Sequence, residues 1–416
     1  MAAAGDRRRH DNGCAGFPLD ENVSNRWHDR SAGMQRLRQP KLFYVTRAAR
    51  IGGPKFSRFE KLEQKLNAAY AIARQQGRWA NPEFETTIDG DEQDFSLRQP
   101  VDLWGKHSLA RRVGNADAAV SSARLESARQ DLRFEVAQQF WALVSAGEAH
   151  SLLDKELDAW DRLLTIRQGE LKAGEISAGD LLTGQTLWSQ RRQARWKLAA
   201  QETSALGALN STLGRPPGTP LALTSSDELR VNVPDVQSAV SLAVQQNPAL
   251  RAARGQLQAA GVRVTQEQRR WAPDLSIGPS PRRTKEDAFP GIFVLFSVPV
   301  WDRNRDGIRG AELNLSAVQD DLESAERQIA QKAFTAYQLW RQASDAVEQQ
   351  RSIIEKTVQP QQSLAEQTYR AGSMSERDLL LVQIDTFQRQ AELTTLRGDL
   401  GLARARLELM ISGGGR

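Results

Sequence analysis

Two short stretches of this 416-residue chain carry the same residue pattern at a fixed separation. The first reads Leu-Lys-Ala-Gly-Glu-Ile-Ser-Ala-Gly-Asp-Leu-Leu and ends at Leu182, and the second reads Tyr-Arg-Ala-Gly-Ser-Met-Ser-Glu-Arg-Asp-Leu-Leu and ends at Leu380. Equivalent serines and equivalent aspartates are both 198 residues apart (375 − 177 and 378 − 180). Self-similarity at a fixed separation indicates an internal duplication. Each element predicted in one half is therefore expected to have a counterpart in the other.

Each stretch holds the residues that end one helix and begin the next. Gly174 and Gly372 follow an apolar helical pattern, and glycine is the residue best able to close a helix in the left-handed conformation. Ser177 and Ser375 come three residues later, and an aspartate follows each serine at the spacing of a capping box. We therefore predict that both stretches are the sharp tips of helical hairpins.

Long amphipathic segments lead into and out of the two tips. Apolar residues recur every three, four or seven positions over 125–171 and again from 311 to 354, the spacing of coiled-coil helices. We predict each segment as a continuous helix of ~60 residues, ~90 Å long at 1.5 Å per residue. Antiparallel helices are expected to return from the tips over 177–213 and 375–411.

The two halves are predicted to share one layout of helix, β-hairpin, very long helix, tip and returning helix. We expect a first repeat at 55–214, a proline-containing linker at 215–234, and a second repeat at 235–413. Residues 1–54 are Arg-rich and lack the apolar core of a secretory signal. We expect them to be a disordered leader or a start that is not native. The predicted fold class is mainly α with a small β part.

The apolar period changes from 3.6 to 2 at the corresponding place in each half. Phe84, Thr86 and Ile88 alternate with polar residues before a turn at 89–91, and a second alternating run follows that turn. In the second half, an alternating pair of apolar residues precedes a Pro-rich polar loop, and the apolar run 292–298 follows it. These patterns predict one β-hairpin in each half, and hence four strands per chain.

Composition excludes several classes of function. The net charge of +5 is nearly balanced, and no basic run is interleaved with aromatic residues, so we expect no nucleic-acid partner. The single cysteine, Cys14, excludes an internal disulfide, and the four histidines lie far apart without ligand spacing. Residues 302–307 imitate the start of a calcium loop, but Leu313 stands where a glutamate is required. We expect no catalytic residues, no cofactor and no metal site.

Tryptophans border both predicted hairpins: Trp79, Trp104, Trp271 and Trp301. Aromatic residues at strand ends mark the interfaces of transmembrane β-barrels. They would equally suit a small soluble sheet capped against helix ends. Four strands leave two exposed edges, which are association sites, and a barrel needs about eight or more strands. Three chains would pool twelve.

Further sequence matches suggest a family. Several short motifs occur in a characteristic order, together with the two tips: Ala80-Asn81-Pro82-Glu83, Val101-Asp102-Leu103-Trp104-Gly105-Lys106, Asn247-Pro248-Ala249-Leu250 and Val298-Pro299-Val300-Trp301-Asp302-Arg303-Asn304. Over about residues 54–413 the chain resembles the TolC-like outer-membrane efflux proteins, and its Asp-Leu-Trp-Gly-Lys motif is most similar to the heavy-metal branch of the cobalt–zinc–cadmium type.

The resemblance implies a homotrimer with a twelve-stranded transmembrane β-barrel in outer-membrane lipid and a long α-helical barrel in the periplasm. Such proteins are passive exit ducts of tripartite pumps. Their expected partners are a periplasmic adaptor and an inner-membrane transporter, here expected to be proton-driven. The tips would dock on the adaptor, and the tryptophans named above would lie at the membrane interface. The expected docking residues are Gly174, Glu175, Ser177, Asp180, Gly372, Ser375, Arg377 and Asp378.

The residues themselves leave a second interpretation open. Any helical hairpin needs a glycine stop and a serine cap, so the tips alone do not require a partner. A soluble or periplasmic coiled-coil scaffold, with the hairpins forming a small sheet, is the alternative function. Four charged residues differ between the tips and would make two docking contacts unequal: Glu175, Arg370, Glu376 and Arg377.

Overall fold

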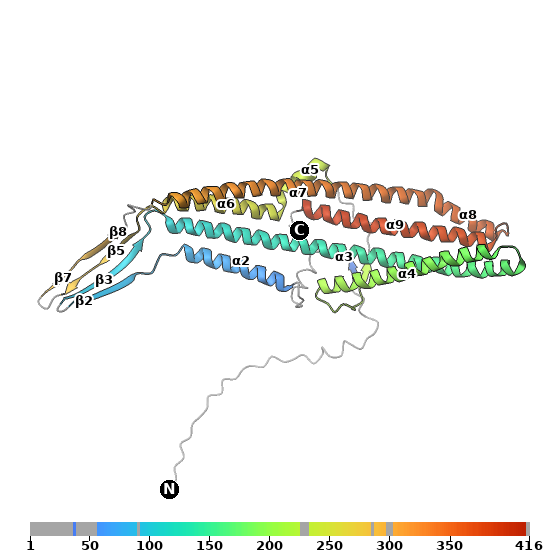
Figure 1. Ribbon diagram of the computed structural model, residues 1–416, viewed down its shortest axis with the longest axis horizontal. Helices are drawn as coiled ribbons and strands as arrows, with labels where there is room; N and C mark the ends of the chain where they lie inside the picture. The colour runs from blue at the N-terminus through green and yellow to red at the C-terminus, as the bar shows by residue number, and fades with distance from the viewer. Residues whose placement is uncertain are drawn as a thin grey trace, which may run out of the picture.

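The protein is elongated, with a six-stranded sheet at one end and the turns of two long helical hairpins at the other (Figure 1). The computed structural model describes residues 36–38, 56–89, 92–224, 233–283, 287–296 and 303–412. The predicted mainly-α fold with a small antiparallel sheet is confirmed. The predicted division at 215–234 remains a prediction.

The helices begin and end close to the predicted boundaries. Their bounds are α2 (Phe56–Gln76), α3 (Lys106–Ala173), α4 (Ala178–Thr212), α5 (Val236–Gln246), α6 (Pro248–Arg269), α7 (Arg305–Ile353), α8 (Gln359–Arg370) and α9 (Glu376–Ile411). The side chain of Asp235 caps α5 by accepting hydrogen bonds from two backbone N–H groups, and Asn247 caps α6. Pro248 occupies the first turn of α6, where a helix needs no N–H from it.

The prediction of two equally continuous long helices was wrong for the second half. α3 is a single α-helix of 68 residues, but α7 gives way to a π-helix, η2 (Ile354–Val358), before α8. Pro360 lies in the first turn of α8. Proline has no N–H to donate to the carbonyl four residues earlier, and its ring collides with that carbonyl in a regular α-helix. The wider π turn is a recognised way to accommodate such a disruption.

Six of the described strands form one antiparallel sheet. It has four lanes, each made of one strand or of two consecutive strands in line. Its members are β2 (Glu83–Asp89), β3 (Glu92–Val101), β5 (Leu275–Pro279), β6 (Arg282–Arg283), β7 (Ala288–Phe289) and β8 (Ile292–Phe296). β2 pairs with β3, β3 pairs with both β5 and β6, β5 pairs with β8, and β6 pairs with β7. Each of the four predicted strands is therefore confirmed as one lane of the sheet. The loop predicted between the last two lanes is shorter than expected, because β6 and β7 extend them.

Register places most of the large apolar residues of the four lanes on one face of the sheet. Phe84 lies opposite Leu97, Gln99 opposite Ile277, and Ile277 opposite Val294. Directly paired residues share a face, so this face also holds Ile88, Ile292 and Phe296. Its apolar side chains are exposed, Ile292 by 84%. We call this surface the apolar sheet face.

The opposite face of the sheet is more polar. Glu85 pairs with Arg98, and the Arg282 Nε lies 3.0 Å from Asp94 Oδ1. The Arg98 guanidinium also lies 5.6 Å from the ring centre of Phe293. Leu295 and Phe289 are exposed on this face as well. The sheet is thus asymmetric, with one apolar and one largely polar face.

Some sequence predictions fall on residues that are not described. The turn at 89–91 is described only at Asp89, and Trp301 and residues 297–302 lie outside the described residues. Of the predicted leader, only β1 (Arg36–Arg38) is described. It pairs in parallel with β4 (Ala222–Thr224), a contact that the sequence did not predict.

Helix α3 is the packing centre of the helical body, with α2, α4, α6 and α9 all against it. Two glycines of α9 lie in close contact with α3. A Cβ on Gly401 would lie 2.2 Å from the Trp141 ring, and a Cβ on Gly398 would lie 2.8 Å from the Ser145 Cβ. Both distances are shorter than real contacts allow, so only glycine lets the two backbones approach this closely.

We predict that Gly401→Ala lowers the unfolding free energy by about 1–3 kcal/mol, because the Trp141 ring must be displaced. Thermal unfolding followed by far-ultraviolet circular dichroism measures this. Gly169→Ala is the matched control in α3, since no atom lies within 4 Å of its Cβ position. It should be neutral or stabilise by up to about 1 kcal/mol. Equal stability of the two variants would contradict the close-packing interpretation.

Candidate functional site

The two helical tips lie next to each other at the end of the molecule opposite the sheet (Figure 1). One joins α3 to α4 and the other joins α8 to α9. The eight tip residues predicted from the sequence therefore gather at one end. They lie in two turns and the first residues of the helices that follow, which we call the first tip (174–180) and the second tip (371–378).

Both tips close their first helix with the same hydrogen bonds. Gly174 has a φ of +78°, and its N–H donates to the Leu171 carbonyl, while the Glu175 N–H donates to the Glu170 carbonyl. Gly372 has a φ of +75° with equivalent bonds to Tyr369 and, from Ser373, to Thr368. This is the Schellman arrangement, which requires a left-handed residue. The predicted glycine stops are confirmed in geometry.

Serines begin the returning helices as the sequence predicted. The Ser177 Oγ accepts a hydrogen bond from the Asp180 N–H at 3.2 Å, and Asp180 Oδ2 accepts one from the Ser177 N–H at 3.1 Å. These two bonds form a complete capping box. In the second tip the Ser375 Oγ accepts from the Asp378 N–H at 3.2 Å.

The capping aspartates are stabilised in their charged form. The hydroxyl of Ser177 donates to the Asp180 carboxylate at 2.8 Å and lowers the pKa of that carboxyl below 3.8. The Ser375 hydroxyl does the same for the pKa of Asp378, with a further contribution from the neighbouring Arg377. Both aspartates therefore stay negatively charged across the neutral and mildly acidic range.

Arg377 makes the two tips different and also connects them. Its Nε lies 3.3 Å from Asp378 Oδ1, and its Nη1 lies 3.5 Å from Oε1 of Glu170, which belongs to the first hairpin. Arg167 has a different role in the first tip, where its Nη1 donates to the Asp180 carbonyl at 3.3 Å. The sequence predicted that the two tips differ in charge, and at position 377 the structure shows such a difference: Arg377 of the second tip forms ion pairs.

A buried carboxylate that the sequence analysis missed joins three helices above the tips. Glu156 in α3 is only 2% exposed. Its Oε1 lies 2.9 Å from the Arg191 Nε of α4 and accepts a hydrogen bond at 2.7 Å from the Gln388 side chain of α9. The Trp160 indole donates to the same oxygen at 3.3 Å. The sequence signal that could have identified Glu156 is its position among the apolar residues of a coiled-coil pattern, where a carboxylate is unexpected.

The tryptophans predicted for the opposite end lie where helices meet strands. Trp79 precedes β2, Trp104 follows β3, and Trp271 precedes β5; all three are exposed, Trp79 by 64%. The Trp104 indole N–H donates to the Pro273 carbonyl at 3.1 Å. This bond ties the junction of the first half to that of the second.

In the described part of the chain, no group of three or more His, Cys, Asp or Glu side chains is arranged to hold a metal ion. None of the helices described combines the length and apolar character needed to cross a membrane. Asn304, in the region resembling a calcium loop, instead donates a hydrogen bond at 2.9 Å to the Glu267 carbonyl, next to the start of α7.

Two curated proteins match this chain with similar sequence identity and coverage. The chain is 25% identical over 276 residues to the nickel-cobalt-cadmium resistance protein NccC of Alcaligenes xylosoxydans, covering 62% of this chain and 61% of that protein. It is 26% identical over 281 residues to the nickel and cobalt resistance protein CnrC of Cupriavidus metallidurans, covering 62% and 64%. The match thus spans less than two thirds of either relative.

Solved structures share the fold at low sequence identity. CusC superposes with a TM-score of 0.70 at 15% identity, covering 89% of this chain and 91% of CusC. The outer membrane protein VceC of Vibrio cholerae gives a TM-score of 0.69 at 14% identity, covering 90% and 97%.

A family model matches the helical and β regions of both halves. The match extends over residues 58–215 and 239–413, which include both tips and all six strands of the sheet. This coverage exceeds half of the chain, and the architecture agrees with it. The chain belongs to the outer membrane efflux protein family.

Proposed function

We propose that this protein is the outer-membrane exit channel of a tripartite efflux pump. In this proposal three copies form a continuous duct, with a twelve-stranded barrel in the membrane and a helical barrel in the periplasm. The channel is passive, and a periplasmic adaptor and an inner-membrane transporter supply selection and energy. The observation that carries the proposal is the apolar sheet face, together with membership of the efflux family.

The apolar sheet face fits a lipid environment better than water. Phe84, Ile88, Ile292, Val294 and Phe296 lie exposed on it. Because the opposite face carries two ion pairs, the sheet has the alternation of a transmembrane barrel wall, apolar outward and polar inward. A soluble scaffold would leave this apolar surface in water, so the channel is the favoured function.

Open edges in both layers support association with further copies. β2 and β8 are the outer lanes of the sheet, and each has one strand edge without a partner among the described strands. Near the tips the helices form a series, with α4 against α3, α3 against α9, and α9 against α7 and α8. Trp196 on α4 and Leu364 on α8 are exposed at the two ends of this series. Head-to-tail contacts close into a ring where the rotation between neighbouring copies allows it, as it would in the proposed trimer.

The tips are proposed to be the surface that docks on the adaptor. They are the part of the chain farthest from the sheet, and a trimer would present six of them. Glu175 and Glu376 are exposed at the tips, and neither forms an ion pair with another described residue. The ionised Asp180 and Asp378 add fixed negative charge. Complementary charge on a partner would steer and orient such contacts.

Metal ions are the proposed cargo. NccC and CnrC are named as resistance proteins for nickel and cobalt, and NccC for cadmium also. We propose that this channel serves the same class of divalent metal ions. A wide duct selects weakly, so the chain needs no metal site of its own for this role.

The trimer is tested by cross-linking its outer lanes. In a Cys14→Ser background, Thr86→Cys on β2 is combined in turn with a cysteine at Ile292, Val294 or Phe296 on β8. At least one pair should give a disulfide ladder that ends at three chains, because neighbouring lanes of adjacent copies lie ~5 Å apart. Each single-cysteine variant is a control and should give no ladder. Membrane-inserted chains that never cross-link would refute the pooled barrel.

Adaptor docking is tested at the exposed tip glutamates. Glu175→Lys with Glu376→Lys should abolish capture of the adaptor and sensitise cells to nickel and cobalt, while the channel stays folded. Glu376 is in the first turn of α9, so its replacement by lysine should lower the unfolding free energy by only about 0.3–1 kcal/mol. The matched control is Glu312→Lys with Asp320→Lys on α7, with the same charge change far from the tips. Normal adaptor capture by the tip variant would count against docking at the tips.

The capping box predicts a pH dependence at the first tip. Since the folded pKa of Asp180 is lowered, its stabilisation is complete above the unfolded value of 3.8 and is lost as pH falls through the folded pKa. Amide hydrogen exchange of residues 174–184 should be unchanged from pH 7 to 5 after correction for intrinsic rates. Ser177→Ala should accelerate it about fivefold. Ser373→Ala, which removes a hydroxyl outside the caps, should leave it unchanged.

A further inference from the structure

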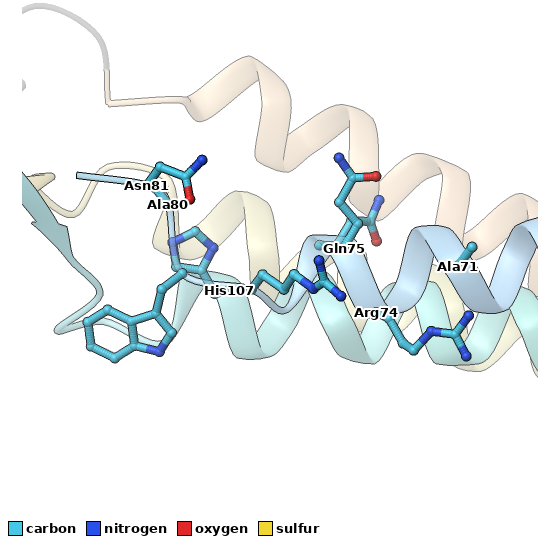
Figure 2. A pocket seen from close by; sticks show the side chains of 9 residues that line it. Ala71, Arg74, Gln75, Ala80, Asn81 and His107 are labelled. Atoms are coloured by element: carbon cyan, nitrogen blue, oxygen red, sulfur yellow. The ribbon is translucent and has the colours of Figure 1, made fainter. Parts of the chain in front are cut away.

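A cationic pocket lies at the junction between the helical body and the sheet. It has a volume of about 620 Å³ and is formed by the end of α2, the segment leading to β2, and the start of α3. Its polar lining includes Arg74, Arg78, Asn81 and His107, with Trp79 also in the wall. Figure 2 shows Arg74 and Gln75 extending from α2, and His107 beside Ala80 and Asn81. We call this the junction pocket.

The junction pocket contains positive charge that the described chain does not neutralise. No aspartate or glutamate lines it. Arg74 is in the last turn of α2 and Arg78 is in the turn just after the helix, and both line the pocket. Both are exposed, and neither side chain has an ion pair or hydrogen bond to another described residue. Two guanidinium groups without carboxylates present ten N–H donors to an anion.

The local packing holds the two walls of the pocket together. A Cβ on Gly77 would lie 2.7 Å from the Arg111 Cδ, so the end of α2 approaches α3 closely at this glycine. Arg111 is one turn after His107 on α3. Asp102 Oδ2 accepts a hydrogen bond from the His107 backbone N–H at 2.8 Å, which fixes the start of α3. The pocket is therefore built by the fold rather than by chance proximity of flexible side chains.

The position of the pocket points to a lipid headgroup as its ligand, an argument that rests on the proposed function. Asn81 lies two residues before β2, and the apolar sheet face begins at Phe84. If that face is in hydrocarbon, the pocket lies at the level of the phosphates of the adjacent leaflet. The exposed Trp79 suits this interfacial depth. Pockets of several hundred cubic ångströms accommodate groups of headgroup size.

The chemistry of the lining selects among headgroups. Guanidinium groups bind phosphate oxygens through paired N–H donors, and the Asn81 amide and His107 imidazole offer further donors. A zwitterionic headgroup also carries an ammonium, which would need a carboxylate that the lining lacks. We propose that the junction pocket binds the phosphate of an anionic phospholipid such as phosphatidylglycerol, with Arg74 and Arg78 as its main ligands.

Lipid binding is tested on the full-length channel in detergent, titrated with short-chain phosphatidylglycerol and followed by native mass spectrometry. Arg74→Gln with Arg78→Gln should weaken phosphatidylglycerol binding at least about tenfold. The matched control is Lys332→Gln with Arg341→Gln, which removes two exposed positive charges from α7 and should retain wild-type affinity. Arg74→Lys with Arg78→Lys should be intermediate, since it keeps charge but loses the paired donors.

Two further titrations separate lipid from other anions. Phosphatidylcholine should bind more weakly than phosphatidylglycerol in the wild type, and millimolar inorganic phosphate should not displace the lipid. Displacement by free phosphate would overturn the lipid assignment. Equal phosphatidylglycerol affinity in the wild type and the Arg→Gln variant would overturn the site itself.

A helix-stability role for the arginines has a distinct signature, because cations near a helix C-terminus stabilise that helix without any ligand. The unfolding temperature without lipid should be the same in both Gln variants, whereas added phosphatidylglycerol should raise it only in the control and the wild type. A variant that unfolds early without lipid and still binds phosphatidylglycerol normally would overturn the proposal. A chain that inserts in the membrane and forms trimers but shows no lipid preference refutes only the pocket, and a chain that never inserts refutes the channel.

Discussion

The close packing of α3 against α9 is the constraint on which the rest of the structure depends. α3 spans most of the length of the molecule and joins a sheet at one end to a tip at the other. Gly398 and Gly401 let α9 lie against Trp141 and Ser145, so the two halves of the chain share one helical layer. Since the halves are held in register here, their strands meet in one sheet and their tips lie side by side.

Polar contacts at particular positions along the helices add to this apolar packing. Glu156 joins α3, α4 and α9 through Arg191 and Gln388. Nearer the tips, Arg377 of the second hairpin reaches Glu170 of the first. Removing a buried carboxylate from water is costly unless several donors compensate for it, and Glu156 has three. Such contacts fix relative position more than they add stability, which suits two hairpins that must present their tips together.

The sheet has two features that suit surroundings other than water: an exposed apolar face and unpaired strand edges. Its register collects large apolar side chains on one face, and its outer lanes leave edges open. Both features are unfavourable for an isolated chain in water, and both are satisfied by lipid and by further copies. The cationic junction pocket lies at the boundary between this sheet and the helices, where a phosphate group would complete it.

The sequence by itself determined the elements and the tips, because these depend on neighbouring residues. A glycine that closes a helix, a serine that caps the next, and a period that changes from 3.6 to 2 act within a few residues of each other. Even the π-helix at Ile354–Val358 has a local cause in Pro360. Only the tertiary structure decided which distant side chains come together. Glu156 meets Arg191 and Gln388, and Arg377 meets Glu170. Arg74 and Arg78 line the same pocket as His107. These partners are distant in sequence, and only the packing of one helix on another brings them within reach.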